Sequence, residues 1–167
     1  AAMSPSETTY FDTSVAAHAK HRIAWLLILM FSSTITGSII TKYKNAFAAI
    51  PLLVSFIPML MDTGGNCGSQ SSTLIIRGIA LGEIRFSDLF RVMFKEFRVS
   101  LIVGVVLALA NGLRILIMYR NAGLALVIGL SLVATVIISK LIGCLLPLFA
   151  KKLHMDPAIM ASPLITT

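Results

Sequence analysis

The chain alternates long apolar runs with short polar segments that are mostly basic. Four runs have about the 20 apolar residues, or more, that a helix needs to cross the hydrocarbon core of a bilayer. They cover residues 23–40, 46–76, 99–119 and 122–150. A fifth run, residues 157–167, is only half a span long. The pattern predicts an all-α, polytopic membrane helix bundle with four full spans plus a truncated fifth.

The second run differs from the others because a polar, glycine-rich stretch interrupts it. As one helix over residues 46–76 it would be about 45 Å long, so it must tilt, kink or protrude from the bilayer. Pro51 and Pro58 predict kinks, since proline lacks the N–H group that a helix interior uses.

The connection between the second and third runs, residues 78–97, is amphipathic rather than uniformly polar. An apolar stripe at helical spacing is available from Ile84, Leu89, Phe90, Met93, Phe94 and Phe97. Ser87 before Asp88 suits a helix start. We expect this connection to lie on the inner membrane interface.

Composition places most of the chain in lipid. Hydrophobic residues make up 57% and charged residues 13%, whereas a soluble domain has about a quarter charged residues. The basic residues, 14 against 7 acidic ones, cluster between the apolar runs without interleaved aromatics. This excess indicates membrane topology, with the lipid bilayer as a partner and no nucleic acid.

Basic residues near the span ends also predict the orientation, because cytoplasmic loops are richer in Lys and Arg. One side collects Lys20, Arg22, Arg77, Arg85, Arg91, Lys95, Arg98, Lys151 and Lys152. The other side has Lys42, Lys44 and Arg120. We therefore predict a multi-pass protein of the inner (cell) membrane with its N-terminus in the cytoplasm.

Two further features set the boundaries of the domain. Residues 1–20 are polar and resemble a tag or the cut end of a linker, so we assign the transmembrane domain to residues 21–167. Cys67 and Cys144 lack the paired spacing of a zinc site or a disulfide framework, and we expect two free, packed thiols.

Polar residues in the second run share one helix face. Positions three or four apart lie on the same side of a helix, and this spacing joins Asp62, Asn66, Ser69 or Gln70, and Thr73. Small residues accompany them at a spacing that lets another membrane helix approach closely, namely Gly64, Gly65, Gly68 and Ser72.

This polar ladder has two interpretations. The amides and hydroxyls can be hydrogen-bonding glue between helices, at about 1 kcal/mol per bond. With Asp62 included, the ladder favours a water-filled path, because a carboxylate in mid-bilayer costs about 2.5 to 3.5 kcal/mol. Neutral oxygens with one carboxylate suit Mg²⁺, which is often held through its water shell. The predicted ligands are Asp62, Asn66, Gln70 and Thr73, and the predicted pore-lining or packing residues are Gly64, Gly65, Gly68 and Ser69.

The remaining polar residues in or near the runs are weaker candidates. Lys140 can be a gating charge, but we favour a lysine that extends to the inner interface. Arg114, one turn from Asn111, suits a structural role near the outer headgroups. His18 and His21 have no Cys or acidic partners for a metal site. Catalytic triads and nucleotide-binding loops are absent from the sequence, so we do not expect an enzyme.

The segment "GGNCGSQSSTLIIRGIALGEI", residues 64–84, resembles the membrane domain of MgtE-type magnesium transporters and channels, whose second span carries a GGNxGxQ pattern. The resemblance extends from "HRIAWLLILM" to "HMDPAIMASPLITT". It implies a homodimer with an ion pore at the subunit interface, lined by the second and fifth spans, with Gly65, Asn66 and Gln70 on the pore-forming segment. It also implies a cytosolic N domain and a CBS pair in the full-length protein, both outside this chain, and an acidic ligand just beyond Thr167.

The function we predict is conduction of Mg²⁺, as transported ion and ligand, and of other divalent cations down their electrochemical gradient. Two alternatives stay open. The chain can be a structural or assembly subunit of the membrane whose ladder only joins helices, or a divalent-cation exporter of the same fold.

Overall fold

The computed structural model describes residues 14–153, and every regular element in that range is helical. The elements are α1 (Val15–Lys42), α2 (Lys44–Ala49), the 3₁₀ helix η1 (Pro51–Phe56), α3 (Ile57–Ala80), the 3₁₀ helix η2 (Phe86–Asp88), α4 (Leu89–Tyr119) and α5 (Ala122–Lys152). The predicted all-α class is therefore confirmed for the described residues. The run at residues 157–167 and the segment 1–13 lie outside them.

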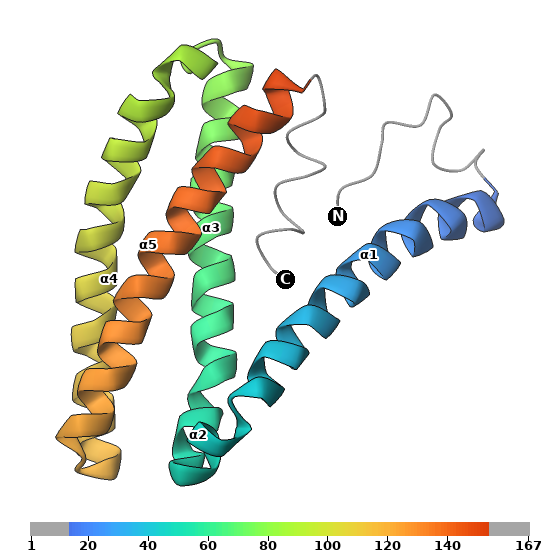
Figure 1. The fold of residues 1–167 in the computed structure, drawn as a ribbon. Helices are drawn as coiled ribbons and strands as arrows, with labels where there is room; N and C mark the ends of the chain where they lie inside the picture. Colours follow the sequence, from blue (N-terminus) through green and yellow to red (C-terminus); the bar gives the residue numbers. More distant parts are fainter. Residues whose placement is uncertain (1–13, 154–167) are drawn as a thin grey trace.

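Helix α5 holds the bundle together because it packs along both α3 and α4, whereas the backbones of α3 and α4 seldom come close to each other. Figure 1 shows α5 crossing from the side of α4 at the lower end to the side of α3 at the upper end. Two apolar clusters fill these contacts. The lower one contains Phe56, Ile115, Leu124 and Ile128. The upper one contains Ile75, Ile79, Cys144 and Leu148.

The second apolar run is interrupted by its prolines, not merely kinked. Helix α2 ends at Ala49, Ile50 is non-helical, and Pro51 opens η1. Pro58 then lies in the first turn of α3, where its missing N–H group has no helical partner to lose. The polar stretch thus belongs to a helix of 24 residues, about 36 Å long, that begins at Ile57.

The connection at residues 78–97 does not form a helix of its own. After a loop and η2, α4 starts at Leu89 and continues without a break to Tyr119. The expected stripe divides, because Ile84, Leu89 and Met93 pack against the upper cluster. Phe90, Phe94 and Phe97 instead point outward and are exposed. At the start of η2, the Asp88 carboxylate accepts a hydrogen bond from the Arg85 backbone N–H at 3.0 Å. The sequence pattern at Ser87 predicted a helix start here but not this contact.

The fourth run agrees closely with α5, which extends it by two residues to Lys152. The turn between α4 and α5 is tight. Arg120 adopts the left-handed conformation (φ 50°) and ends α4. The Asn121 side chain then caps α5 by accepting a hydrogen bond from the Leu124 N–H at 2.9 Å.

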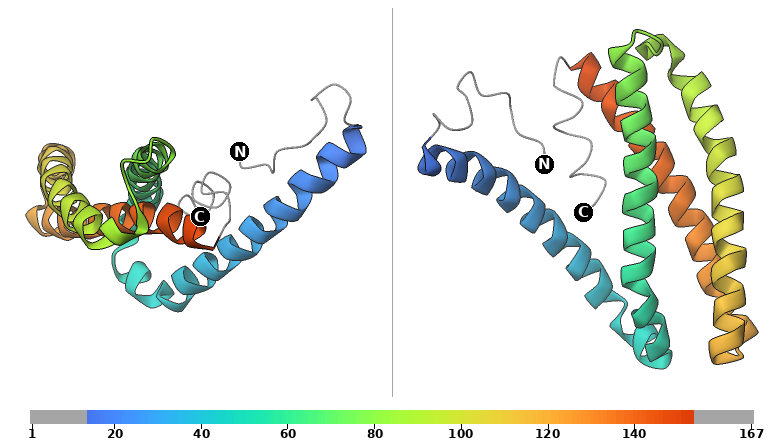
Figure 2. Two further views of the ribbon diagram at one scale, coloured as in Figure 1. Left: turned by 90° about the horizontal axis from the view of Figure 1, so that it is seen from above. Right: turned by 180° about the vertical axis from the view of Figure 1, so that it is seen from behind.

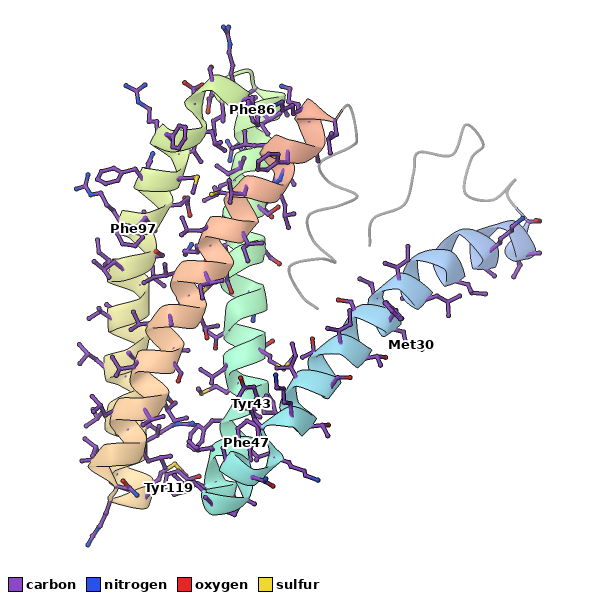
Figure 3. All side chains as sticks on the ribbon, viewed as in Figure 1. Met30, Tyr43, Phe47, Phe86, Phe97 and Tyr119 are labelled. Carbon is purple, nitrogen blue, oxygen red and sulfur yellow. The ribbon has the colours of Figure 1, made fainter. Side chains whose placement is uncertain are left out.

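Helix α1 has few packing contacts with the rest of the described structure. Among the described residues it contacts α2 and leads away from the α3–α5 bundle, as both views in Figure 2 show. The apolar side chains that the structure describes on α1 point in several directions, and Met30, on a stretch that α3–α5 do not approach (Figure 3), is 63% exposed. Such a helix needs lipid or another protein surface around it.

Two stretches of the described residues are long and apolar enough to cross a membrane, namely Phe86–Tyr119 and Ala122–Lys152. A shorter apolar helical stretch covers Leu26–Lys42. Helix α3 carries too many polar residues to meet the same criterion. The count of four complete spans thus stays a prediction.

Candidate functional site

The residues of the polar ladder lie on the side of α3 that faces away from α5. Each helical residue advances by about 100°, so Asp62, Ser69, Gln70 and Thr73 all fall within about 60° of Asn66. Ser69 is half-buried, and the other four are exposed. The helical spacing thus brings the predicted ligands together on one face.

Contacts along this face are local and leave most oxygens accessible. The Asn66 amide donates a hydrogen bond to the Asp62 carboxylate over 3.1 Å. The Thr73 hydroxyl donates to the Ser69 backbone carbonyl over 2.9 Å. Both bonds join residues one turn apart, so within the described residues the ladder does not bond to another helix. An interhelical role as glue would need a partner outside them.

An open groove of about 730 Å³ runs along the ladder. It is lined by Asn66, Ser69, Gln70, Thr73 and Leu74. Six water molecules around an octahedral Mg²⁺ occupy about 180 Å³ at about 30 Å³ each. The groove therefore has room for a hydrated divalent ion. Within the described residues there is no group of three or more His, Cys, Asp or Glu side chains placed to hold a metal.

The opposite side of α3 packs tightly on α5 through its small residues. A Cβ atom added to Gly143 of α5 would collide with the backbone carbonyl of Gly68. A Cβ atom on Gly64 would lie 2.8 Å from the Thr135 methyl group. Gly65 is also buried. These glycines let the two helix backbones approach within contact distance.

A buried polar cluster, which we call the Ser71 cluster, joins all three helices of the bundle. It consists of Ser71 on α3, Glu96 on α4 and Lys140 on α5. The Ser71 hydroxyl donates to the Glu96 carboxylate over 2.6 Å. The Lys140 ammonium donates to the same hydroxyl over 3.2 Å and lies 3.9 Å from Glu96.

The Ser71 cluster corrects one prediction and adds a residue that the sequence reasoning missed. Lys140 is only 4% exposed, so the prediction that it extends to the inner interface is wrong. Glu96 escaped notice because we assigned it to an interfacial connection, whereas α4 carries it into the bundle. The sequence signal that could have revealed Glu96 was Lys140 itself, a lysine far from either end of a predicted helix, since a buried ammonium requires a partner.

The other candidates have modest roles within the described residues. Arg114 is exposed and lies 3.8 Å from the Met59 sulfur and 5.9 Å from the centre of the Phe56 ring. The Asn111 amide nitrogen is buried without a hydrogen-bond partner there. The side chains of His18 and His21 lie outside what the structure describes.

A second pocket, of about 490 Å³, reaches Glu96 and Lys140 between the end of α3 and the start of α4.

Within the described residues, two helices apolar enough to cross a membrane and an open polar groove on α3 are typical of the class of helical membrane proteins. The particular family follows from comparison with known proteins. Residues 57–167 match MgtE, a divalent cation transporter family, and the chain belongs to that family. The resemblance noted in the sequence is thereby confirmed.

Curated relatives agree with this assignment. The magnesium transporter MgtE of Bacillus subtilis (strain 168) is 38% identical over 157 residues, which is 94% of this chain and 35% of the relative. The magnesium transporter MgtE of Thermus thermophilus is 34% identical over 163 residues, or 96% of this chain and 36% of the relative. The chain thus spans about a third of the length of the curated relatives it matches. These relatives are named as transporters, not enzymes.

Proposed function

We propose that this chain is the membrane part of a protein that conducts Mg²⁺ down its electrochemical gradient. The observation that carries the proposal is the exposed polar face of α3 on a bundle whose other outer surfaces are mostly apolar. A carboxylate and two amides facing hydrocarbon would be costly, and water or an aqueous partner surface removes that cost.

The chemistry of this face suits an ion that keeps its water shell. Mg²⁺ prefers oxygen ligands and dehydrates reluctantly. Asp62 supplies the only negative charge of the face, and Asn66, Gln70 and Thr73 supply neutral oxygens. We assign these four residues to outer-shell contacts with hydrated Mg²⁺, with Ser69 lining the groove beside them. The names of the curated relatives, magnesium transporters, support this choice of ion.

A second copy of the chain completes the path in this proposal. The groove is open on the side away from α5, so one copy forms only part of a wall. Two copies that place their α3 faces toward each other would enclose a polar channel and keep its oxygens out of lipid. The same arrangement leaves the apolar faces of α4 and α5 for the bilayer.

The proposed topology has four full spans, a fifth span beginning near residue 157, and a cytoplasmic N-terminus. Basic residues support this orientation: Arg77 and Lys151 belong to the last turns of α3 and α5, and Arg91 belongs to the first turn of α4. These three helix ends lie at the upper end of the bundle in Figure 1. Arg120 lies at the lower end, between α4 and α5. A positively charged end faces the cytoplasm by the positive-inside rule.

Cysteine labelling in intact cells tests the topology. Both Lys44 and Glu83 are exposed in the structure. A membrane-impermeant thiol reagent should modify Lys44→Cys in intact cells, and Glu83→Cys only after the membrane is permeabilised. The reverse pattern contradicts the orientation.

Uptake of Mg²⁺ tests the conduction face. The protein, expressed from its complete reading frame, should let cells that lack their own Mg²⁺ uptake systems grow at low Mg²⁺. Asp62→Ala and Asn66→Ala should each lower the initial uptake rate about tenfold, the equivalent of about 1.4 kcal/mol of lost ion stabilisation. The matched control is Thr34→Ala on α1, an exposed hydroxyl that bonds only to the Met30 carbonyl.

Uptake also separates the alternatives. Correct insertion without any uptake would favour a structural or assembly subunit. Net efflux at a clamped membrane potential, with the Mg²⁺ gradient directed inward, would favour an exporter. Normal uptake by both α3 variants would leave the ladder as glue between helices.

A further inference from the structure

The three members of the Ser71 cluster come from three different helices and are almost completely buried. Ser71 is 0% exposed, Lys140 4% and Glu96 8%. The hydroxyl of Ser71 lies at the centre of the cluster, donating to Glu96 and accepting from Lys140. Helix α3 is therefore tied to both α4 and α5 through one short, directional side chain.

The cluster differs from simple apolar packing in what it contributes, because a buried ion pair adds little net stability. The cost of removing two charges from water offsets most of their attraction. Directional hydrogen bonds, in contrast, select one relative arrangement of the groups they join. The cluster can thus specify how α3 is oriented even where it adds little to the free energy of unfolding.

The glycine contacts of α3 cannot select that orientation alone. Gly64 and Gly68 let α3 approach α5 closely, and Ile75 and Ile79 pack against α5 in the upper cluster, but apolar contacts lack the directionality of a hydrogen bond. Ser71 lies about 140° from Asn66 around that axis and directly follows Gln70 in the chain. Holding its hydroxyl in place consequently determines where Asn66 and Gln70 point.

We infer that Ser71, Glu96 and Lys140 are positioning residues that set the rotation of α3, so that its polar face meets the ion path and not lipid. This inference rests on the proposed function, since the ion path is part of that proposal. The rotation itself is measurable without any transport.

Thiol accessibility measures the rotation. In a background of Cys67→Ala and Cys144→Ala, single cysteines replace Ser69, Gln70, Thr73 or Leu74, and their reaction rates with a water-soluble methanethiosulfonate are compared. Adding Ser71→Ala should lower the reaction rates of the cysteines that replace Gln70 and Thr73 about fivefold relative to those that replace Ser69 and Leu74. A fivefold ratio corresponds to about 1 kcal/mol for one lost hydrogen bond.

The neighbouring serine provides a matched control. Ser72 is also buried on α3, yet its hydroxyl has no hydrogen-bond partner among the described residues. Ser72→Ala therefore removes the same atom from the same helix without touching the cluster. It should leave the labelling pattern unchanged. Equal patterns for Ser71→Ala and Ser72→Ala would overturn the inference.

A second variant separates positioning from stability. Glu96→Leu combined with Lys140→Met removes both charges together, so no buried charge is left unpaired and folding should survive. Ser71 then has no partner in the cluster, and the labelling pattern should shift as in Ser71→Ala at unchanged thermal stability. A folded double variant with the original pattern would contradict the inference.

Transport is measured in parallel with the same variants. If the unmodified protein labels as expected but moves no Mg²⁺, the proposed function fails and the positioning result stands. If the unmodified protein conducts and Ser71→Ala changes neither the labelling nor the uptake rate, the positioning inference fails and the proposed function stands.

Discussion

The two sides of α3 carry similar kinds of residues and have opposite environments. Ser69 and Thr73 lie beside the open groove, whereas Ser71 and Ser72, one or two positions away, are buried. The groove side keeps its bonds within one turn of the helix. The buried side reaches Glu96 and Lys140, which lie 25 and 69 positions further along the chain.

The role of a small polar residue in a membrane helix therefore depends on which neighbouring helices pack against it. The Ser71 hydroxyl takes part in hydrogen bonds to α4 and α5, whereas Ser69 and Thr73 line an open groove. The two sides should therefore respond differently to substitution. Mutations on the buried side that leave a charge unpaired or crowd the contact between α3 and α5 should lower stability, whereas mutations on the groove side should change conduction at nearly unchanged stability.

The largest change in stability is expected for Lys140→Met. Removing the ammonium leaves Glu96 as a buried carboxylate without its cation, which typically costs about 3–5 kcal/mol. Unfolding in mixed detergent and SDS micelles measures the loss. The paired variant Glu96→Leu with Lys140→Met should recover most of it, and additive losses from the two substitutions would show that the residues do not act as a pair.

A smaller loss is expected for Gly143→Ala, where the added methyl group meets the backbone carbonyl of Gly68. Forcing extra atoms into a packed contact costs about 1–3 kcal/mol. The control is Gly112→Ala in α4, since nothing lies within 4 Å of its added Cβ atom. The same unfolding assay should find Gly112→Ala neutral to slightly stabilising, because alanine favours a helix interior more than glycine does. Equal losses for both variants would mean that α3 and α5 are not in close contact.

The smallest change in stability is expected on the groove side. Asp62→Ala and Asn66→Ala remove one exposed hydrogen bond between neighbouring turns, and exposed substitutions usually stay within about 0.5 kcal/mol. Stability is measured in the same micelles used for the buried variants. A loss as large as that of Gly143→Ala would indicate that the ladder packs against another surface and does not line water.

Several features of this protein were predictable from the chain alone. Helix α5 follows from the long apolar run at residues 122–150, which is a local signal. The shared face of Asp62, Asn66 and Thr73 follows from helical spacing once α3 is known to be a helix. Membership of the MgtE family follows from the glycine-rich motif beginning at Gly64.

Local patterns were misleading where a competing tertiary contact decided the outcome. The third run was expected to begin at residue 99, yet α4 already begins at Leu89, where Leu89 and Met93 pack on the upper cluster. The second run looked like a kinked helix, but two prolines seven residues apart gave the chain separate short helices before α3.

The sequence by itself determined the membrane class, the family and the polar face of α3, because composition and periodicity act over one helix at a time. Only the tertiary structure decided that Gly68 meets Gly143 and that Lys140 meets Ser71 and Glu96. Those partners are far apart in the chain, and no local period records them. They are selected by how closely α5 can approach α3 and α4, which depends on the packing of all three helices together.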